Sequence, residues 1–375
     1  MKIAFVYDRI NKFGGAERVL QTLHQIWPQA PIFTAVYNPK TSSWAKNILI
    51  KPSFLQHFPL AKTHHELYPW LTPLAFESFN FNNYDVVISV TSAEAKAIIT
   101  QPNTLHLCYC LTPTRYLWSH QQDYQSFPGL GSWNKLSKFV FKKTAKYLQQ
   151  SDLIASSRPD KYIAISQAVQ KRIKQYYHRS SVIIHPPVNV KKFSKKSKPK
   201  YKILNTKYYL LVSRLTSYKK IDLAIKTFNK LKKNLIIVGS GRERKRLQTI
   251  AGPTISFAGQ VSDQELTKLY QHCQALIMSQ EEDFGITAVE AMSAGKPVIA
   301  FNKGGILDTV IHKKTGILFS AQTVDSLTSA VKQFISSAWD TKIIKTQAKK
   351  FDQQIFKNKI KTFVEEQWKK QKKSR

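Results

Sequence analysis

The sequence predicts an α/β protein made of two doubly wound domains, each built on a parallel β-sheet, and three observations lead to this fold class. The chain has 375 residues, more than a single hydrophobic core usually serves. Hydrophobic residues make up 42% of it, which is enough to fill two cores. Strand-length apolar runs alternate with segments of helical periodicity through most of the chain, as in sheets covered by helices on both faces.

Regular structure is predicted through most of the first half. Apolar runs predict strands at 2–7, 31–36, 84–90, 105–110, 162–166 and 182–185. Helical periodicity predicts helices between them, from about residue 16 and at 92–99, 133–148 and 168–177. Pro186-Pro187 then ends the regular pattern, because proline lacks the amide hydrogen that helices and strands use.

The second half repeats this plan after a Lys-rich stretch. Strands are predicted at 208–213, 235–239, 255–258, 275–278 and 298–301, with helices at 221–231, 242–250 and 263–272. The predicted divisions are a first domain at 1–190, a linker at 191–207, a second domain at 208–345 and a basic helical tail at 346–375. Two such sheets facing each other would form a cleft lined by strand ends, where ligands bind in open α/β folds.

Membrane spans, export signals and disulfides are not predicted. The N-terminal apolar run is too short for a signal peptide and predicts a first strand instead. No uninterrupted apolar segment reaches the roughly 18 residues that span a bilayer. Cys108, Cys110 and Cys273 have no zinc-like spacing, so we expect reduced, buried thiols and a cytoplasmic protein.

The net charge of +35 is extreme, and most of it falls between residues 111 and 250. A field of that sign attracts nucleic acid, anionic lipid or phosphorylated substrates. Solvated lysines in a linker, as in the stretch 191–200, explain the excess equally well. Composition alone therefore does not choose a partner.

The acidic turn after the predicted strand 275–278 is the most informative feature of the sequence. Gly285 frees the backbone there, and a helix opens near Thr287, so that Glu282 and Glu290 bracket a helix N-terminus. Unpaired amides and the helix dipole favour a bound anion at this position, which leaves both carboxylates to accept hydrogen bonds from sugar hydroxyls. In the alternative interpretation, Thr287 and Glu290 form a capping box that holds only the helix start.

Two further strand ends suit a phosphorylated ligand. Arg214 follows strand 208–213 directly, and Lys219 lies five residues on, so a guanidinium and an ammonium can grip a diphosphate and neutralise a leaving group. Gly14 and Gly15, between the first strand and helix, permit close approach of phosphate or a sugar hydroxyl. Ordinary surface cations and a tight turn are the alternatives. With the acidic turn, these groups favour a nucleotide-diphosphate sugar.

The segment from Leu111 to Trp118 follows another strand. Arg115 can meet a phosphate or a sugar carboxylate while neighbouring aromatic rings stack on a sugar face, but a proline turn packed with core aromatics explains the segment as well. The sequence has no D-x-D motif, P-loop, G-x-S-x-G elbow or H-E-x-x-H motif. We therefore expect no metal and no cofactor besides the donor substrate.

The predicted helix 133–148 is amphipathic. One side carries Trp133, Leu136, Val140 and Tyr147, and another carries Lys135, Lys138, Lys142 and Lys146. Such a helix can rest on an anionic membrane. Its apolar stripe can equally pack on the sheet with the lysines in water.

In order and spacing these segments resemble family-4 glycosyltransferases of the GT-B fold, especially bacterial mannosyltransferase-like enzymes of surface-polysaccharide and lipid-linked glycan assembly. The resemblance runs from Lys2 to about Phe319. It rests on Gly14-Gly15-Ala16-Glu17, Thr112-Pro113-Thr114-Arg115, Tyr162–Ser166, Ser213-Arg214-Leu215 with Lys219, the pair Glu282 and Glu290, and Gly304-Gly305. It implies two Rossmann-like domains facing a cleft, an acceptor on the N-terminal side, and a tail that returns to the first domain.

The resemblance also implies roles for single residues. Glu290 would hold the donor ribose and Glu282 the donor sugar, while Arg214 and Lys219 would bind the diphosphate. Other implied donor contacts are Gly14 and Gly15 from the first domain, the backbone at Phe284, Gly285 and Ile286, and Val261 beside the base. Leu111 stands where relatives often have a histidine, which puts a histidine-assisted step in doubt and leaves Leu111 and Arg115 as acceptor-side or sugar-side candidates. Asn189 stands where aspartate is common.

The predicted function is therefore a retaining, metal-independent glycosyltransferase. It would move a hexose, with mannose from GDP-mannose favoured, onto a glycan or lipid-linked acceptor at the inner membrane face. A nucleotide-sugar epimerase of the same fold would use the same cleft without an acceptor. A nucleic-acid-binding protein would explain the charge but none of the strand-end carboxylates and glycines.

Overall fold

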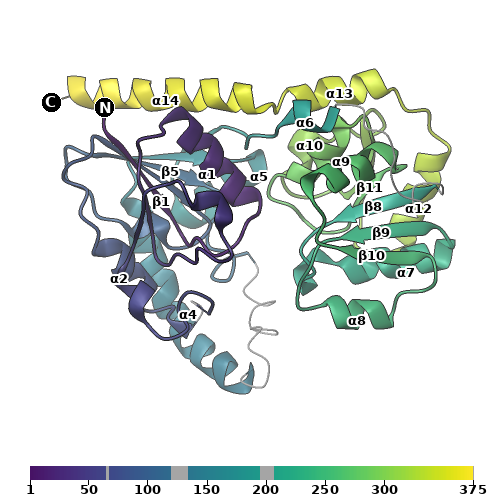
Figure 1. Cartoon of the computed structure of the whole chain (residues 1–375), viewed down its shortest axis with the longest axis horizontal. Helices are drawn as coiled ribbons and strands as arrows, with labels where there is room; N and C mark the ends of the chain where they lie inside the picture. The colour runs from purple at the N-terminus through teal and green to yellow at the C-terminus, as the bar shows by residue number, and fades with distance from the viewer. Residues whose placement is uncertain (65–66, 120–133, 195–206, 375) are drawn as a thin grey trace. The chain divides into compact units, whose positions relative to one another are not determined.

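The computed structural model describes residues 1–64, 67–119, 134–194 and 207–374, without the side chains of 134–144. The chain divides into two compact α/β units (Figure 1). The first comprises Met1–His185 and Phe356–Arg375, and the second comprises Pro186–Ile355. Each unit is built on one parallel sheet, which confirms the predicted fold class of two doubly wound, Rossmann-like domains. How the two units face each other stays a prediction.

The first unit contains a seven-stranded sheet in the order β3-β2-β1-β4-β5-β6-β7. Its strands are β1 Ile3–Tyr7, β2 Ile32–Thr34, β3 Ile50–Pro52, β4 Val86–Thr91, β5 Leu105–Cys110, β6 Lys161–Ala164 and β7 Ser181–Ile183. β1, β2, β4 and β5 are buried throughout, as expected for strands covered on both faces. The strand order reverses between β1 and β4.

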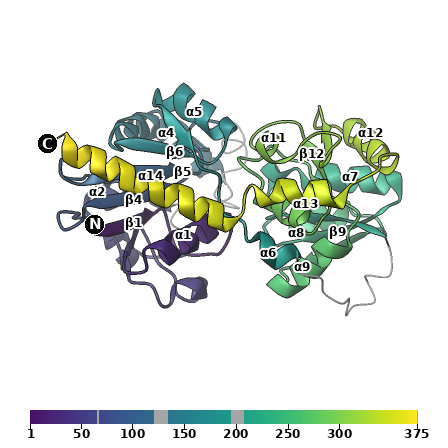
Figure 2. The ribbon, with the colours of Figure 1, turned by 90° about the horizontal axis from the view of Figure 1, so that it is seen from above.

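Helices and short turns cover this sheet. They are α1 Gly15–Ile26, η1 Ser43–Ala45, η2 Phe54–His57, α2 Thr72–Glu77, η4 Ala95–Ala97, α4 Asn134–Ser157 and α5 Gln167–Tyr177. The last helix, α14 (Gln353–Lys373), also lies across this unit (Figure 2). It buries Phe356, Ile360 and Val364, and Phe356 meets Tyr109 of β5 edge-on at 5.8 Å between ring centroids.

The second unit has a six-stranded sheet in the order β10-β9-β8-β11-β12-β13. Its strands are β8 Tyr208–Val212, β9 Asn234–Val238, β10 Ile255–Gly259, β11 Leu276–Met278, β12 Val298–Phe301 and β13 Gly316–Phe319. Its helices are α6 Val190–Ser194, η7 Ser217–Lys219, α7 Ile221–Leu231, α8 Arg244–Thr249, α9 Asp263–His272, α10 Ile286–Ser293, α11 Ile306–Thr309, α12 Val324–Ile335 and α13 Thr341–Lys349. The order again reverses beside the first strand, between β8 and β11.

The predicted helix 92–99 is wrong, and Asp8 explains why. Its buried carboxylate, at the end of β1, accepts hydrogen bonds from the amides of Ser92 (2.8 Å) and Ala95 (2.9 Å) and from the hydroxyl of Thr91 (2.7 Å). These bonds hold the chain in a bend and leave only the short turn η4. The structure also contains the short strands β3 and β13, which the apolar pattern did not indicate.

The boundary region differs from the prediction. Residues 191–194, assigned to the linker, lie in α6, where the side chain of Asn189 accepts a hydrogen bond from the Lys192 amide at 3.0 Å. Phe193 packs edge-on against Tyr270 of α9 at 5.5 Å, so this segment belongs to the second unit. Residues 195–206 of the predicted linker lie outside the described residues. At the other end, 346–355 stay with the second unit and 356–375 with the first.

All three cysteines are buried free thiols, as predicted. Burial raises the pKa of the Cys273 thiol to about 12, so it is an inert packing group. Among the residues that the structure describes, none of the helices has the length and hydropathy needed to cross a bilayer.

Burial strongly perturbs His106, a titratable group in β5 of the first unit. Its Nε2 atom lies 2.9 Å from the Ser89 hydroxyl, and within the described part of the chain its Nδ1 atom has no hydrogen-bond partner. Burial, with smaller contributions from Arg158 and Arg179, lowers the pKa of His106 to about 3. The ring is therefore neutral in the folded protein at any pH above that value.

This burial should make the protein sensitive to acid. The unfolded chain binds a proton at His106 near pH 6.5 while the folded chain does not, so stability is complete above pH 6.5 and falls as the pH drops towards 3. Between pH 7 and pH 5, wild type should lose about 2 kcal/mol of unfolding free energy more than His106→Gln, measured by urea unfolding. Equal losses in both proteins would contradict this assignment.

Candidate functional site

The reversal of strand order in the second unit brings two loops together at the carboxyl edge of its sheet. One loop, 213–220, follows β8, and the other, 279–285, follows β11. The Ser279 hydroxyl joins them by donating to the backbone oxygen of Lys220 at 2.7 Å. Such a switch point is where open α/β sheets bind ligands.

An ion pair crosses this switch point. Lys219, at the end of the first loop, donates to the Glu282 carboxylate in the second, and the two side chains are only 12% and 17% exposed. Gln280 donates to the same Glu282 oxygen at 2.5 Å. Two residues predicted as separate ligand contacts thus lie together and neutralise each other.

Arg214 lies on the same loop as Lys219. Its side chain is exposed, and its guanidinium donates to the hydroxyl of Tyr218 at 2.8 Å. The loop therefore carries two cations at the end of β8. The backbone of the loop 213–220 is held by a hydrogen bond from the Leu215 amide to the Ser240 carbonyl at 2.9 Å.

Glycines outside the predicted site allow neighbouring loops to pack closely against the loops 213–220 and 279–285. A Cβ atom added at Gly305 would lie 1.9 Å from the Asp283 carbonyl oxygen, and one at Gly304 would lie 2.3 Å from that of Glu282. On the other side, a Cβ atom at Gly241 would lie 2.2 Å from the Leu215 carbonyl oxygen. No side chain fits at these distances, so the strand-end glycines set the shape of the site.

Helix α10 begins beside the acidic turn. Gly285 is its N-cap, with φ +87° in the left-handed region that favours glycine, and Ile286 is its first residue. Phe284 is buried and meets Phe351 edge-on at 5.5 Å. Phe284, Gly285 and Ile286 therefore place the first-turn amides of α10 directly after Glu282, where an anion would be favoured.

Glu290 occupies a different environment from Glu282. It lies on the second turn of α10, is 1% exposed, and accepts a hydrogen bond from the Tyr270 hydroxyl of α9 at 2.8 Å. The capping-box alternative does not hold, because the N-cap of α10 is Gly285 and the helix has no side-chain cap. The Thr287 hydroxyl instead contacts the Met278 sulfur at 3.9 Å.

Val261, the predicted base contact, lies at the carboxyl end of β10. It is half-buried, follows Gly259 (φ +71°) and precedes Ser262, the N-cap of α9. Its strand is two positions from β8 in the sheet. Val261 is therefore on the same sheet edge as the charged pair but further along it.

In the first unit, Gly14 and Gly15 open helix α1, with Gly14 as N-cap. The buried Glu17 carboxylate lies beneath them: it accepts from the Tyr7 hydroxyl at 2.6 Å, and a Cβ atom on Gly14 would lie 3.2 Å from its other oxygen. Burial, followed by the charge of Glu17, raises the pKa of Tyr7 well above its usual range. Glu17 thus supports the turn from inside the unit.

Leu111 and Arg115 lie on the loop after β5, and both are half-buried. Asp152 of α4 anchors this loop: its carboxylate pairs with the buried Lys96 at 2.5 Å and accepts from Thr114 at 2.8 Å. Its other oxygen accepts from Trp118 and from Tyr177, also at 2.8 Å. Although burial lowers the pKa of Lys96, the charge of Asp152 more than offsets this and raises it above the usual range, so the Lys96 ammonium keeps its charge.

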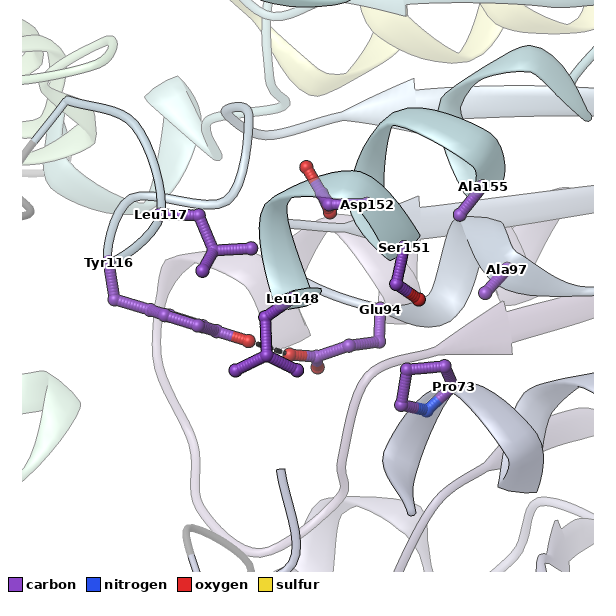
Figure 3. Close-up of a pocket in the computed structure, with 9 residues that line it drawn as sticks. All are labelled: Pro73, Glu94, Ala97, Tyr116, Leu117, Leu148, Ser151, Asp152 and Ala155. Atoms are coloured by element: carbon purple, nitrogen blue, oxygen red, sulfur yellow. Dashed lines mark hydrogen bonds between the residues drawn. The ribbon is translucent and has the colours of Figure 1, made fainter. Parts of the chain in front are cut away.

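Figure 3 shows a small hollow beside this network, lined by residues of α2, the η4 region, the loop after β5 and α4. Its lining residues are Pro73, Glu94, Ala97, Tyr116, Leu117, Leu148, Ser151, Asp152 and Ala155. The Tyr116 hydroxyl donates to the half-buried Glu94, whose pKa is raised by burial. Sequence analysis missed Glu94, Lys96 and Asp152, because no local motif connects them.

Comparison with known proteins identifies the second unit. Residues 189–351 match the family of glycosyl transferases group 1. We call this segment of the second unit the group 1 domain. The fold is GT-B, as predicted: the crystal structure of Anabaena Alr3699/HepE in complex with UDP and glucose is similar at a TM-score of 0.72 and 19% identity, over 98% of this chain and 100% of that one.

Curated relatives of the chain include two mannosyltransferases. Alpha-1,3/1,6-mannosyltransferase ALG2 of Rhizomucor pusillus is 28% identical over 213 residues, 44% of this chain and 47% of the relative. A GDP-mannose-dependent alpha-(1-6)-phosphatidylinositol monomannoside mannosyltransferase of Mycobacterium tuberculosis is 28% identical over 154 residues, 36% of this chain and 40% of the relative. The chain thus spans about half the length of the curated relatives it matches.

In the group 1 domain and in the first unit alike, part of the predicted site residues lies at one edge of the sheet. Of the predicted amphipathic helix, the side chains of 133–144 lie outside the described residues, whereas Lys146 and Tyr147 are exposed. In the described part of the chain, no three His, Cys, Asp or Glu side chains cluster as metal ligands would. Whether catalysis needs a metal stays a matter for experiment.

Because Thr287 does not cap α10 whereas Thr323 caps α12, replacing each by alanine should change the unfolding free energy by different amounts. Thr287→Ala should change the unfolding free energy by less than about 0.5 kcal/mol, because Thr287 caps nothing. Thr323→Ala is the matched control: Thr323 accepts from the Ser326 amide as N-cap of α12, and its loss should cost about 1 kcal/mol. Urea unfolding measures both, and an equal cost for the two variants would restore the capping interpretation.

Proposed function

We propose that this protein is a retaining glycosyltransferase that moves a hexose from a nucleotide-diphosphate sugar to a glycan or lipid-linked acceptor. The Lys219–Glu282 pair at the switch point of the group 1 domain is the observation that carries the proposal. It holds a cation and a carboxylate, both shielded from water, beside the first-turn amides of α10. These are the groups that a charged diphosphate and a hydroxylated sugar require together.

Donor binding would redistribute the charges of this pair. The diphosphate would take Lys219 and the nearby Arg214 as partners, and Glu282 would turn to the hydroxyls of the sugar. The amides of Phe284, Gly285 and Ile286 would add hydrogen bonds to phosphate and sugar. In this arrangement Glu290, with Tyr270 as its neighbour, would accept from the ribose hydroxyls, and the backbone at Val261 would contact the base.

The reaction would proceed on one face of the sugar. The bond between the anomeric carbon and the diphosphate oxygen breaks, and the acceptor oxygen bonds to the same face of that carbon as its proton passes to the departing diphosphate. Arg214 and Lys219 would stabilise the charge that develops on the leaving group. Gly14, Gly15, Leu111 and Arg115 would contribute from the first unit, and no metal would be needed.

The favoured sugar is mannose and the favoured donor GDP-mannose. Two relatives are named as mannosyltransferases, one of them GDP-mannose-dependent and acting on a phosphatidylinositol mannoside, which supports a lipid-linked acceptor. The structurally similar Anabaena protein holds UDP and glucose, so the base must be tested directly. The proposed location is the cytoplasm, peripheral on the inner face of the membrane.

Replacement of Arg214 tests the diphosphate assignment. Arg214→Ala should lower the rate of transfer by about 10²–10³, because a contact to developing charge is lost. Arg246→Ala is the matched control, since Arg246 is exposed on α8 and pairs only locally with Glu243 in the interactions described here. Both are assayed with EDTA present. A folded Arg214→Ala enzyme with normal turnover would contradict the proposal.

A donor panel tests the two glutamates and the choice of base. GDP-mannose should raise the melting temperature of wild type more than UDP-glucose does, since a ligand of the folded state stabilises it. Glu290→Gln should weaken GDP-mannose binding about tenfold. Glu365→Gln, on the exposed side of α14, should bind as wild type does. If neither nucleotide sugar changes the melting temperature, the proposed donor class is refuted, and a donor converted without an acceptor would indicate an epimerase.

A further inference from the structure

Arg244 is a half-buried cation that the predicted site does not include. It is the first residue of α8, directly after the loop 239–243 that follows β9. Lys245 and Arg246, which follow it, are exposed. Within the described part of the chain, the Arg244 side chain forms no hydrogen bond or ion pair, because the neighbouring Glu243 carboxylate pairs with Arg246 at 2.6 Å. A guanidinium has five N–H donors, so one that is partly shielded from water and lacks a protein partner suits a ligand.

The Arg244 guanidinium lies beside the carboxyl end of β10. Gly259, the last residue of that strand, is buried, and a Cβ atom on it would lie 3.3 Å from the Nη1 atom of Arg244. The pairing of β10 with β9 is irregular here, with a register shift between Phe257 and Gly259. Val261 follows two residues later. Arg244 therefore reaches from the loop after β9 to the segment where the proposed function places the base.

Glycine backbone forms the surface next to Arg244. The amide of Gly239, which follows β9, donates to the Gly259 carbonyl at 2.7 Å. Gly239 has φ +130°, and a Cβ atom on it would lie 1.9 Å from the Ser213 carbonyl oxygen at the end of β8. No side chain fits at that distance. Bare backbone of this kind lets a flat ring approach closely.

The groups along this sheet edge follow the order of the parts of a nucleotide-diphosphate sugar. Four strands lie side by side in the order β10-β9-β8-β11. Neighbouring strands are about 4.8 Å apart, so the four span roughly 14 Å, a length that an extended nucleotide-diphosphate sugar covers. Glu282 follows β11, Arg214 and Lys219 follow β8, Arg244 follows β9, and Val261 follows β10. With the sugar at Glu282 and the diphosphate at the two cations of β8, the base falls beside Arg244.

We propose that Arg244 selects the base of the donor by donating two parallel hydrogen bonds to O6 and N7 of guanine. These two acceptors lie side by side on one edge of guanine and match the fork of a guanidinium, the commonest specific contact of arginine with a base. Uracil has no such pair, since its two carbonyl oxygens are separated by a ring N–H group. Adenine has an amino donor in place of O6. The inference rests on the proposed function and deepens it, because it names the residue that decides between GDP and UDP donors.

A phosphate is the other acceptor that a guanidinium grips with two hydrogen bonds. GDP and UDP carry the same diphosphate, so a phosphate contact would contribute equally to both. A guanine contact contributes to GDP alone. The ratio of the two affinities therefore separates the two partners.

Binding of free nucleotides to the full chain, measured by isothermal titration calorimetry, tests the proposal. Arg244→Ala should bind GDP about tenfold more weakly, while its affinity for UDP changes by less than about twofold. Arg244→Lys should not restore GDP binding, because an ammonium group is a single point charge without the fork. Arg246→Ala, on the same helix, is the matched control and should bind both nucleotides like wild type.

Two analogues locate the contact on the base. Inosine diphosphate keeps O6 and N7, so it should lose affinity on Arg244→Ala as GDP does. The 7-deaza analogue of GDP lacks the N7 acceptor. It should bind wild type more weakly than GDP does, and the replacement of Arg244 should weaken its binding less.

Three results would overturn the inference. They are a wild-type affinity for UDP as high as that for GDP, an unchanged GDP affinity in Arg244→Ala, or an equal loss for both nucleotides, which would assign Arg244 to the diphosphate. Melting temperatures without nucleotide report the folding of each variant. If wild type binds neither nucleotide, the proposed donor class fails and the inference with it. If wild type transfers a hexose from GDP-mannose while Arg244→Ala keeps its GDP affinity, only the base assignment fails.

Discussion

The reversal of strand order beside the first strand of each sheet is the constraint on which the rest of the structure depends. In the second unit it places the loops after β8 and β11 next to each other at one sheet edge, and the Lys219–Glu282 ion pair joins them. Shielding both charges from water costs several kcal/mol, which their attraction and the hydrogen bond from Gln280 offset. A pair held in this balance can exchange partners with a charged ligand, because a diphosphate satisfies the lysine and hydroxyl groups satisfy the carboxylate.

The first unit has the same reversal, between β1 and β4, but joins its loops differently. There Asp8 accepts hydrogen bonds from Thr91, Ser92 and Ala95, all of them neutral donors from the neighbouring loop. A buried carboxylate engaged with two backbone amides and a hydroxyl fixes a loop, since removing a donor leaves part of its charge unsatisfied. The shared topology therefore has a fixed junction in the first unit and, in the proposed function, an exchangeable one in the group 1 domain.

The parts of the fold that could be predicted are those that depend on local pattern. Strands such as β4 and β5 are buried on both faces, so they occur as continuous apolar runs that the sequence displays directly. The short edge strand β3 is partly exposed and contains Pro52, so it does not form a continuous apolar run that the sequence would display. The contacts that organise the site join residues far apart in sequence: Asp8 lies 83 residues from Thr91, Lys96 lies 56 from Asp152 and Lys219 lies 63 from Glu282. Residue type predicted a ligand-binding role for Lys219 and Glu282 separately, but only the folded structure shows that they are partners.

The two glutamates of the acidic segment show how one short motif supplies two kinds of carboxylate. Glu282 precedes α10 and meets a cation at a partly open edge, whereas Glu290 lies within the helix, almost fully buried beside the Tyr270 hydroxyl. The left-handed Gly285 between them makes this division, because it starts the helix early enough to place Glu290 on the second turn, beyond the reach of a cap. A carboxylate at the helix start could serve only the helix or an exposed ligand. One turn further on, it accepts from the Tyr270 hydroxyl in a dry environment, where in the proposed function a hydroxyl group of the donor would compete with that hydroxyl.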